Sequence, residues 1–353
     1  MTQYFMRFAR TSIGLGLAVF SMSTVSQEHA ADITAVGIEA EAVQAAEPIL
    51  SSQISPRAAE MAVKAPDSPL VKVVNNGESY VAVGSRGHIL MSKNAKDWQQ
   101  VRTPVDSLLT SVTFADARNG WAVGHDSVIL RTSDGGMTWV VQNYQPDLSK
   151  PLFDVLFIDP DRGYAVGAYG LFLFTLDGGS TWSQVATNPV TEDERHLNAL
   201  TRLGDGSLMV IGEAGLIGRS DDAGDTWMRL ESPYESSLFC VIPAGDKGAL
   251  IGGLRGNLFY SADTQIGGWS KIETRTDQSF FGMSALPRGE VALVGLNSTL
   301  LLLGKNRAVR HIPINDSRGN RQTETLSSVL PVEDGGVLLV GDAGVQRLDA
   351  SKF

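Results

Sequence analysis

The sequence contains 353 residues, of which 43% are hydrophobic and 19% are charged, enough material for one large domain or two smaller ones. The formal net charge of -10 argues against a nucleic-acid-binding protein, which normally carries a basic face, and against docking on an anionic membrane surface. The 37 glycines and 14 prolines favour many short strands joined by turns over long helices.

The N-terminus has the pattern of an export signal. Two arginines precede a short apolar run, Ser12 to Met22, and small residues then offer cleavage sites after Ser26 or after Ala30. The run is shorter than the roughly 20 residues that a permanent membrane helix needs, although an uncleaved anchor is the alternative. We expect residues 1–26 to be a signal peptide and the mature chain to be periplasmic or otherwise extracytoplasmic, without direct membrane insertion.

The segment that follows the predicted signal, residues 27–69, differs in composition from the rest of the chain. Alanine, glutamate, glutamine and serine dominate it, prolines interrupt it, and aromatic residues are absent, which is typical of a partly ordered linker. The single cysteine, Cys240, permits no intrachain disulfide and lies in an apolar stretch, so we expect it to be a buried core residue.

From residue 70 onward one pattern recurs: an apolar strand that ends in glycine, a short turn, and a second apolar strand. Seven copies occur, and their marker glycines lie between 40 residues (Gly84 to Gly124) and 46 residues (Gly295 to Gly341) apart. The markers are Gly84, Gly124, Gly167, Gly212, Gly253, Gly295 and Gly341.

Each copy also holds an apolar stretch upstream and a further short strand downstream, which gives about four antiparallel strands per repeat. Seven such units predict an all-β fold, a seven-bladed β-propeller over residues 70–353; a β-solenoid would use shorter repeats. The last repeat, Thr325 to Phe353, lacks a fourth strand. Because an open ring would expose sheet edges, we expect part of Ile54 to Val63 to supply that strand.

Three repeats carry the Asp-box, S/T-x-D-x-G-x-T-W, in the last hairpin of the blade. The aspartate can accept hydrogen bonds from the turn, the glycine can take a positive φ, and the tryptophan can pack between blades. We therefore predict a structural role for these residues and not metal binding or catalysis. They are Asp134, Gly136 and Trp139, then Asp177, Gly179 and Trp182, then Asp222, Gly224 and Trp227.

The repeat unit resembles that of the photosystem II stability and assembly factor family of Asp-box propellers. Asn119 to Trp139 and Gly163 to Trp182 carry the match best. The resemblance implies a seven-bladed propeller that assists a membrane protein in a lumenal or periplasmic compartment. In bacteria without photosynthesis it would imply a role beside an envelope exporter. The concentrated arginine set associated with photosynthetic members is absent here.

Asp-boxes also occur in sialidases, so a carbohydrate-directed propeller, either a glycoside hydrolase or a lectin, is the alternative. A sialidase places its first arginine in an aromatic-Arg-Ile-Pro sequence, and the nearest run here, His311-Ile312-Pro313, lacks the arginine. The chain has no nucleophile elbow, no zinc motif and no metal-ligand spacing among its five histidines. We therefore expect no catalytic residue, no metal and no cofactor.

In a propeller, the turns between strands two and three share one face with the inter-blade loops, and this face usually binds ligands. We predict a protein partner here, a membrane protein or its complex, bound by a monomer. The loops include Tyr144 to Lys150, Thr191 to His196, Tyr234-Glu235 and Asp316 to Arg321. The candidate binding residues are those that vary between copies: Arg86, His88, His125, Asp126, Tyr169, Glu213, Arg255, Asn257, Asn297 and Asp342.

Overall fold

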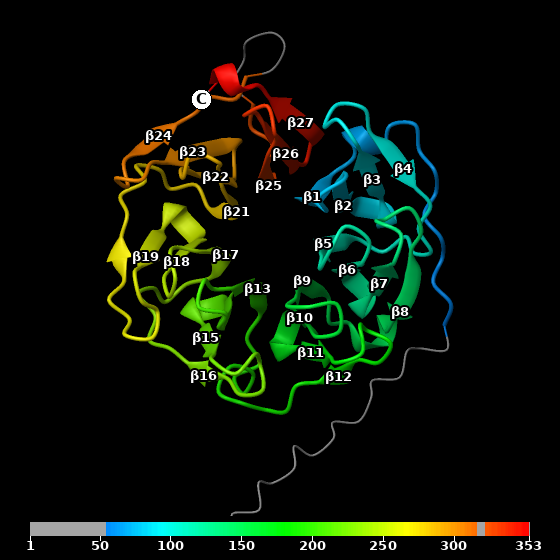
Figure 1. The fold of residues 1–353 in the computed structure, drawn as a ribbon, viewed down its shortest axis with the longest axis horizontal. Coiled ribbons are helices and arrows are strands. Elements are labelled where there is room, and N and C mark those ends of the chain that lie inside the picture. The colour runs from blue at the N-terminus through cyan, green and yellow to red at the C-terminus, as the bar shows by residue number, and fades with distance from the viewer. Residues whose placement is uncertain (1–53, 316–321, 353) are drawn as a thin grey trace, which may run out of the picture. The chain divides into compact units, whose positions relative to one another are not determined.

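A computed structural model describes residues 54–315 and 322–352. The predicted signal peptide and the loop from Asp316 to Arg321 lie outside these ranges. The described part of the chain forms seven antiparallel sheets around one axis (Figure 1), so the predicted seven-bladed propeller is confirmed. No helix within residues 54–315 or 322–352 is long and apolar enough to span a membrane.

The first four blades each contain four strands in sequence order. Blade one comprises β1 (Leu70–Asn75), β2 (Tyr80–Gly84), β3 (Ile89–Ser92) and β4 (Gln99–Val101). Blade two comprises β5 (Leu109–Phe114), β6 (Gly120–Gly124), β7 (Ile129–Thr132) and β8 (Val140–Asn143). Blade three comprises β9 (Leu152–Phe157), β10 (Gly163–Gly167), β11 (Phe172–Thr175) and β12 (Ser183–Gln184). Blade four comprises β13 (Leu197–Arg202), β14 (Leu208–Gly212), β15 (Ile217–Ser220) and β16 (Met228–Arg229).

The remaining three blades continue the pattern, except that the last has three strands. Blade five comprises β17 (Leu238–Pro243), β18 (Ala249–Gly253), β19 (Leu258–Ser261) and β20 (Ser270–Lys271). Blade six comprises β21 (Phe280–Ala285), β22 (Val291–Gly295), β23 (Thr299–Leu303) and β24 (Val309–His311). Blade seven comprises β25 (Leu326–Pro331), β26 (Val337–Gly341) and β27 (Gly344–Leu348).

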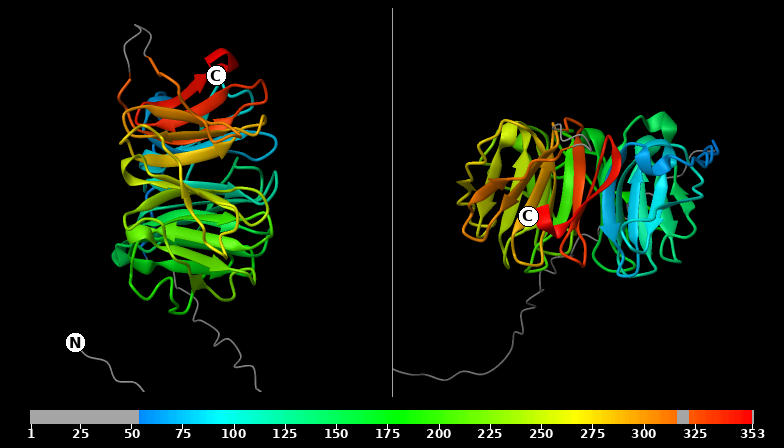
Figure 2. Two further views of the ribbon diagram at one scale, coloured as in Figure 1. Left: turned by 90° about the vertical axis from the view of Figure 1, so that its left-hand side faces the viewer. Right: turned by 90° about the horizontal axis from the view of Figure 1, so that it is seen from above.

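The first strand of every blade lies innermost and contacts the first strand of the next blade (Figures 1 and 2). β25 contacts β1 in the same way, which closes the ring. The second strand is fully buried in six blades and almost so in blade six, because the next blade covers it on each side. The core is therefore a set of apolar layers between blades and not one central cluster.

The expectation that Ile54 to Val63 completes blade seven is wrong. These residues form no strand; the segment runs beside β4 of blade one, where the Ala59 N–H donates to the Thr103 carbonyl (3.1 Å). The Gln100 side chain holds the same segment, since its oxygen accepts from Ala62 N (2.7 Å) and its amide donates to the Glu60 carbonyl (2.9 Å). A short 3₁₀ turn, η1 (Ala65–Asp67), contacts β27 instead of a fourth strand.

The marker glycines end the second strand of every blade, as the repeat predicts. At each one, the following residue donates its N–H to the carbonyl that precedes the first strand, as Leu296 does to Ser279 (3.0 Å). A Cβ on Gly295 would lie 1.8 Å from that carbonyl oxygen, and at the other six markers it would lie between 1.9 Å and 2.4 Å from the corresponding oxygen. Only glycine therefore allows the two backbones to meet at this end of the blade.

Candidate functional site

The three Asp-boxes lie in the hairpins between strands three and four, on the outside of the ring (Figure 1). In the first, Asp134 Oδ1 accepts from the Thr138 N–H (2.9 Å) and the Thr132 hydroxyl (2.8 Å), and Oδ2 accepts from the Thr138 hydroxyl (2.6 Å). Asp177 and Asp222 make the same three contacts in their own hairpins. Both carboxylate oxygens are thus occupied by the turn itself.

The other Asp-box residues pack the hairpin onto the preceding blade. Gly136, Gly179 and Gly224 take positive φ values, and each donates its N–H to the hydroxyl that opens the box. Trp139, Trp182 and Trp227 are buried in clusters that combine residues of two adjacent blades. The indole N–H groups of Trp139 and Trp227 donate to the carbonyls of Gly136 and Gly224.

These hydrogen bonds make the Asp-box sensitive to acid. Burial opposes ionisation of Asp134, but hydrogen bonds from Thr138 and Thr132 outweigh it and hold the pKa of the carboxyl below its ordinary value. We expect Asp134→Ala to lower the free energy of unfolding by about 1 kcal/mol at neutral pH. Because the folded pKa is depressed, this stabilisation is present above about pH 4 and is lost as the pH falls through the folded pKa.

Urea unfolding of the wild type and the variant at pH 7 and pH 3 measures this difference. The difference in the free energy of unfolding between the wild type and Asp134→Ala should be smaller at pH 3 than at pH 7. Asp161→Ala is the matched control, because Asp161 is exposed in a neighbouring turn and only its backbone carbonyl accepts a hydrogen bond, from the Gly178 N–H. An equal loss in both variants would mean that the Asp134 hydrogen bonds add no stability.

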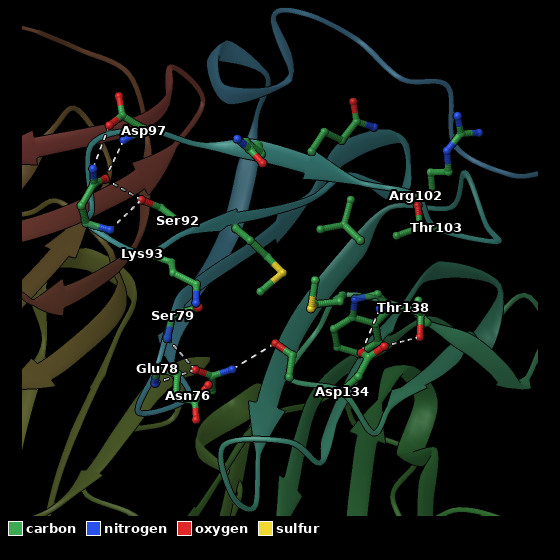
Figure 3. A pocket seen from close by; sticks show the side chains of 18 of the residues that line it. Asn76, Glu78, Ser79, Ser92, Lys93, Asp97, Arg102, Thr103, Asp134 and Thr138 are labelled. Carbon is green, nitrogen blue, oxygen red and sulfur yellow. Dashed lines mark hydrogen bonds between the residues drawn. The ribbon is translucent and has the colours of Figure 1, made fainter.

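A large groove lies between the outer parts of blades one and two and has a volume of about 990 Å³ (Figure 3). Met91, Val101 and Trp139 contribute apolar surface to it. Polar side chains along it are engaged with the turns that border it: Asn76 of blade one donates to the Gly135 carbonyl of blade two (3.0 Å), and Asp134 holds its Asp-box. The groove therefore belongs to the packing of two adjacent blades at the rim.

A second cavity, of about 580 Å³, occupies the central channel and is lined by all seven blades. A β-bulge places its lining residues. In each first strand the second residue has no partner on the second strand, as Phe153 lies between Leu152, opposite Gly167, and Asp154, opposite Val166. The same shift occurs in the other six blades. The bulge turns two successive side chains of each blade toward the channel.

These side chains form two rings. The upper ring, from the bulged residues, comprises Val71, Thr110, Phe153, Asn198, Phe239, Phe281 and Ser327. The lower ring, from the residues that follow, comprises Lys72, Ser111, Asp154, Ala199, Cys240, Gly282 and Ser328. The upper ring lies at the end of the strands that also carries the predicted binding face, because β2–β3 turns and their equivalents begin there.

Aromatic rings gather at one side of the channel mouth. The ring centroids of Phe239 and Phe281, on blades five and six, lie 5.4 Å apart. The imidazole of His196 packs edge-on against Phe153 (5.9 Å) and Tyr169 (4.8 Å), and its Nδ1 accepts from the Tyr169 N–H (3.1 Å). All of these side chains except Tyr169, which is 53% exposed, are half-buried.

The predicted binding residues lie on this face with one exception. Arg86, Asp126, Tyr169 and Arg255 occupy the middle of 3₁₀ turns with positive φ, which directs them away from the sheet. His88 is buried at 3% exposure, so it is wrong as a candidate: it follows the turn and points into the blade. The remaining candidates are exposed or half-exposed: His125, Glu213, Asn257, Asn297 and Asp342.

Several of these candidates also hold the turns together. Asp126 accepts from the Ser107 hydroxyl (2.5 Å), Asp342 from the Thr325 N–H (3.0 Å), and Asn297 donates to Gln278 (2.6 Å). Their positions therefore serve the fold as well as the face. The binding assignments themselves remain predictions.

Sequence reasoning missed the phenylalanines of the channel mouth. The signal was present, because Phe153, Phe239 and Phe281 each directly follow the large apolar residue that starts a first strand. In a regular strand that position would face the layer opposite to its neighbour, so only the bulge reveals that it lines the channel. The described ranges contain no group of three histidine, cysteine, aspartate or glutamate side chains arranged to hold a metal ion.

The fold and its hairpins define an Asp-box, or BNR-repeat, β-propeller whose seven blades share one face around a partly aromatic channel mouth. The family model for the photosynthesis system II assembly factor YCF48 matches residues 90–149 and 142–237. The photosystem II assembly protein Ycf48 of Thermosynechococcus vestitus is 32% identical over 199 residues, which cover 56% of this chain and 56% of that protein. Over this part of its length the chain is similar to photosystem II assembly factors.

Solved structures support the fold but not a finer assignment. Ycf48 bound to a D1 peptide has a TM-score of 0.63 and 17% identity, covering 84% of this chain and 97% of that one. Ycf48 from Cyanidioschyzon merolae has a TM-score of 0.65 and 14% identity, covering 84% and 99%. The WD40 propeller of Doa1 scores 0.64, so this likeness reports the architecture alone. By sequence, the chain spans about half the length of the curated relatives that match it over the longest stretches.

Proposed function

We propose that the chain is a non-catalytic assembly factor that binds a segment of a membrane protein on the face around the channel mouth. The single observation that carries this proposal is the mouth itself: bulges of all seven blades present side chains there, among them three half-buried phenylalanines. Such apolar rings beside polar turns suit a peptide segment, since aromatic residues, phenylalanine among them, are enriched at protein interfaces. The solved structure of YCF48 bound to a D1 peptide has the same architecture.

The Asp-box geometry supports binding over catalysis. The three carboxylates lie in outer hairpins, and each accepts hydrogen bonds on both oxygens, so they brace the blades. In the channel, Asp154 is also engaged, because it accepts from the Ser111 hydroxyl (2.7 Å) and from the Leu200 N–H (2.9 Å). A pair of unengaged carboxylates, as a glycoside hydrolase needs, is not formed by these groups.

We place this activity on the extracytoplasmic side of a membrane, on the strength of the N-terminal export pattern. In a photosynthetic organism the partner would be a photosystem subunit, and in other bacteria it would be a component of an envelope exporter. A carbohydrate-directed propeller is the competing function, and it would bind a sugar at the same mouth.

Site-specific photo-crosslinking in intact cells tests the proposal. A benzophenone side chain at Tyr169 or Asn297 should capture an integral membrane protein, identified by mass spectrometry. The same group at Glu333, on the opposite face, or at Ile266, which is 83% exposed, should not capture it.

Equal capture from all four positions, or capture of soluble proteins alone, would contradict the proposed face. A thermal-shift screen with sugars separates the competing function. A rise in the unfolding temperature with any sugar, abolished by Phe239→Ala, would favour a lectin or a hydrolase.

A further inference from the structure

The channel mouth has an apolar side and a floor of small residues beneath it. Phe239 and Phe281 form the upper ring on blades five and six, and Ala199, Cys240 and Gly282 lie in the lower ring on blades four to six. A larger residue cannot easily replace Gly282, because a Cβ there would lie 2.6 Å from the Ser327 carbonyl oxygen of blade seven. Close packing of blades six and seven therefore excludes a side chain at position 282.

The floor is also uncharged. Cys240 is buried, its thiol donates to the Gly252 carbonyl (3.6 Å), and burial raises the pKa of the thiol to about 12. The thiol therefore stays neutral at any physiological pH. Small apolar floors beneath aromatic walls accept a planar ring, because edge-to-face contacts with the walls add to the apolar area that is buried.

One lysine side chain lines the channel. Lys72 lines it from blade one, and no hydrogen bond or ion pair joins its ammonium group to another of the described residues. Asp154 also lines the channel, but no ion pair joins its carboxylate to Lys72; its two oxygens accept hydrogen bonds from Ser111 and Leu200. The charge of Lys72 reaches the opposite wall, where it counteracts the effect of burial on the Cys240 thiol. A half-buried ammonium group of this kind favours an incoming carboxylate.

We propose that the channel mouth recognises an aromatic side chain next to an acidic one in the bound segment. The aromatic ring packs against the exposed faces of Phe239 and Phe281, and the carboxylate of the adjacent aspartate or glutamate pairs with Lys72. This proposal rests on the proposed function, and it names the chemistry of the segment that the face selects.

Phage display tests this inference and the proposed function separately. Random twelve-residue peptides are selected for binding to the immobilised full chain. Enriched peptides should contain an aromatic residue beside aspartate or glutamate. Synthetic copies should lose affinity about tenfold or more with Phe239→Ala/Phe281→Ala, the loss typical of removing a central interface anchor. Ala199→Phe, which fills the floor without removing a wall, should cause a similar loss.

Lys72→Met isolates the charge. The variant should bind the acidic peptides about fivefold to tenfold more weakly than the wild type does. Its affinity for copies in which asparagine or glutamine replaces the acidic residue should be unchanged. Lys93→Met on the outer rim is the matched control, and it should not alter affinity. Unfolding temperatures within a few degrees of the wild type establish that each variant is folded.

The outcomes separate the two proposals. Enriched peptides that lack the aromatic–acidic pair, or that bind all channel variants as tightly as the wild type, would overturn this inference and leave the peptide-binding face intact. Failure to enrich any peptide would count against the proposed function itself. Enrichment with the predicted losses would support both.

Discussion

Gly295→Ala should lower the free energy of unfolding by about 3 kcal/mol, the upper end of the usual cost of over-packing, with a lost hydrogen bond included. The added Cβ would lie 1.8 Å from the Ser279 carbonyl oxygen, which belongs to backbone and cannot turn aside. Relief requires β22 to move away from the start of β21, which breaks the hydrogen bond from the Leu296 N–H to that carbonyl (3.0 Å).

The same movement would reach the channel. Phe281 owes its position to the bulge that follows Phe280, and Phe280 pairs with Gly295. We therefore expect Gly295→Ala to weaken binding at the mouth as well as stability. Equilibrium unfolding in urea measures the stability, and the change in transition midpoint at constant slope reports it directly.

Gly304→Ala is the matched control for this prediction. Its φ is not positive, and the nearest atom to an added Cβ is the side-chain oxygen of Asn306 at 3.0 Å, which can shift. We expect a change within about 0.5 kcal/mol, since alanine also reduces the entropy of the unfolded chain. Similar midpoints for the two variants would show that the close backbone approach at the marker glycine is not required.

Arg219→Met should lower the free energy of unfolding by about 3 kcal/mol or more, as expected when one partner of a buried ion pair is removed. Arg219 is 2% exposed and donates to Asp205 (2.8 Å), Asp221 (2.7 Å) and the Thr264 hydroxyl (2.7 Å). The first two contacts lie within blade four and the third reaches blade five. Methionine fills similar space but leaves the Asp205 carboxylate, itself only 18% exposed, without its countercharge.

The pH dependence of this loss provides a second readout. Burial opposes ionisation of Asp205, but hydrogen bonds from Ser207 and Arg219 lower its pKa to about 2. A depressed folded pKa means that the stabilisation is present above the unfolded value of about 4 and disappears as the pH falls toward 2. The penalty of Arg219→Met should therefore be largest at neutral pH and shrink below pH 4 in urea unfolding experiments.

Arg229→Met is the control for the charge itself. Arg229 pairs with Asp193 at 2.6 Å, but both side chains are about one-third exposed or more. Ion pairs in such solvated positions contribute below about 1 kcal/mol. If Arg219→Met cost no more than Arg229→Met, the buried network would not join blades four and five as we infer.

Features that depend on a few neighbouring residues were predictable from the sequence. The marker glycines, such as Gly295, end their strands because the close approach involves two adjacent strands of one blade. The Asp-box likewise closes on itself, since the Asp134 carboxylate accepts hydrogen bonds from Thr132 and Thr138 of the same hairpin. Local hydrogen bonds and sterics repeat with the sequence, and they therefore predicted both the blade and the number of blades.

Predictions that depended on distant parts of the chain failed or missed the site. Ring closure was assigned to Ile54–Val63, whereas β1 and β25 close the ring through their inner strands and the segment lies along β4. His88 was grouped with its exposed neighbour Arg86, although the chain turns inward between them. In both cases the relevant contact joins residues whose proximity no short pattern records.

The amino-acid sequence by itself determined the architecture, because each blade is encoded by a repeat of about forty residues with its own turns and apolar strands. Only the tertiary structure decided what the centre of the ring presents. Phe153, Phe239 and Phe281 come from three blades, and they meet at one mouth because a bulge rotates each of them out of its sheet. That rotation follows from the packing of backbone against the marker glycines, and its result depends on how seven blades close around one axis.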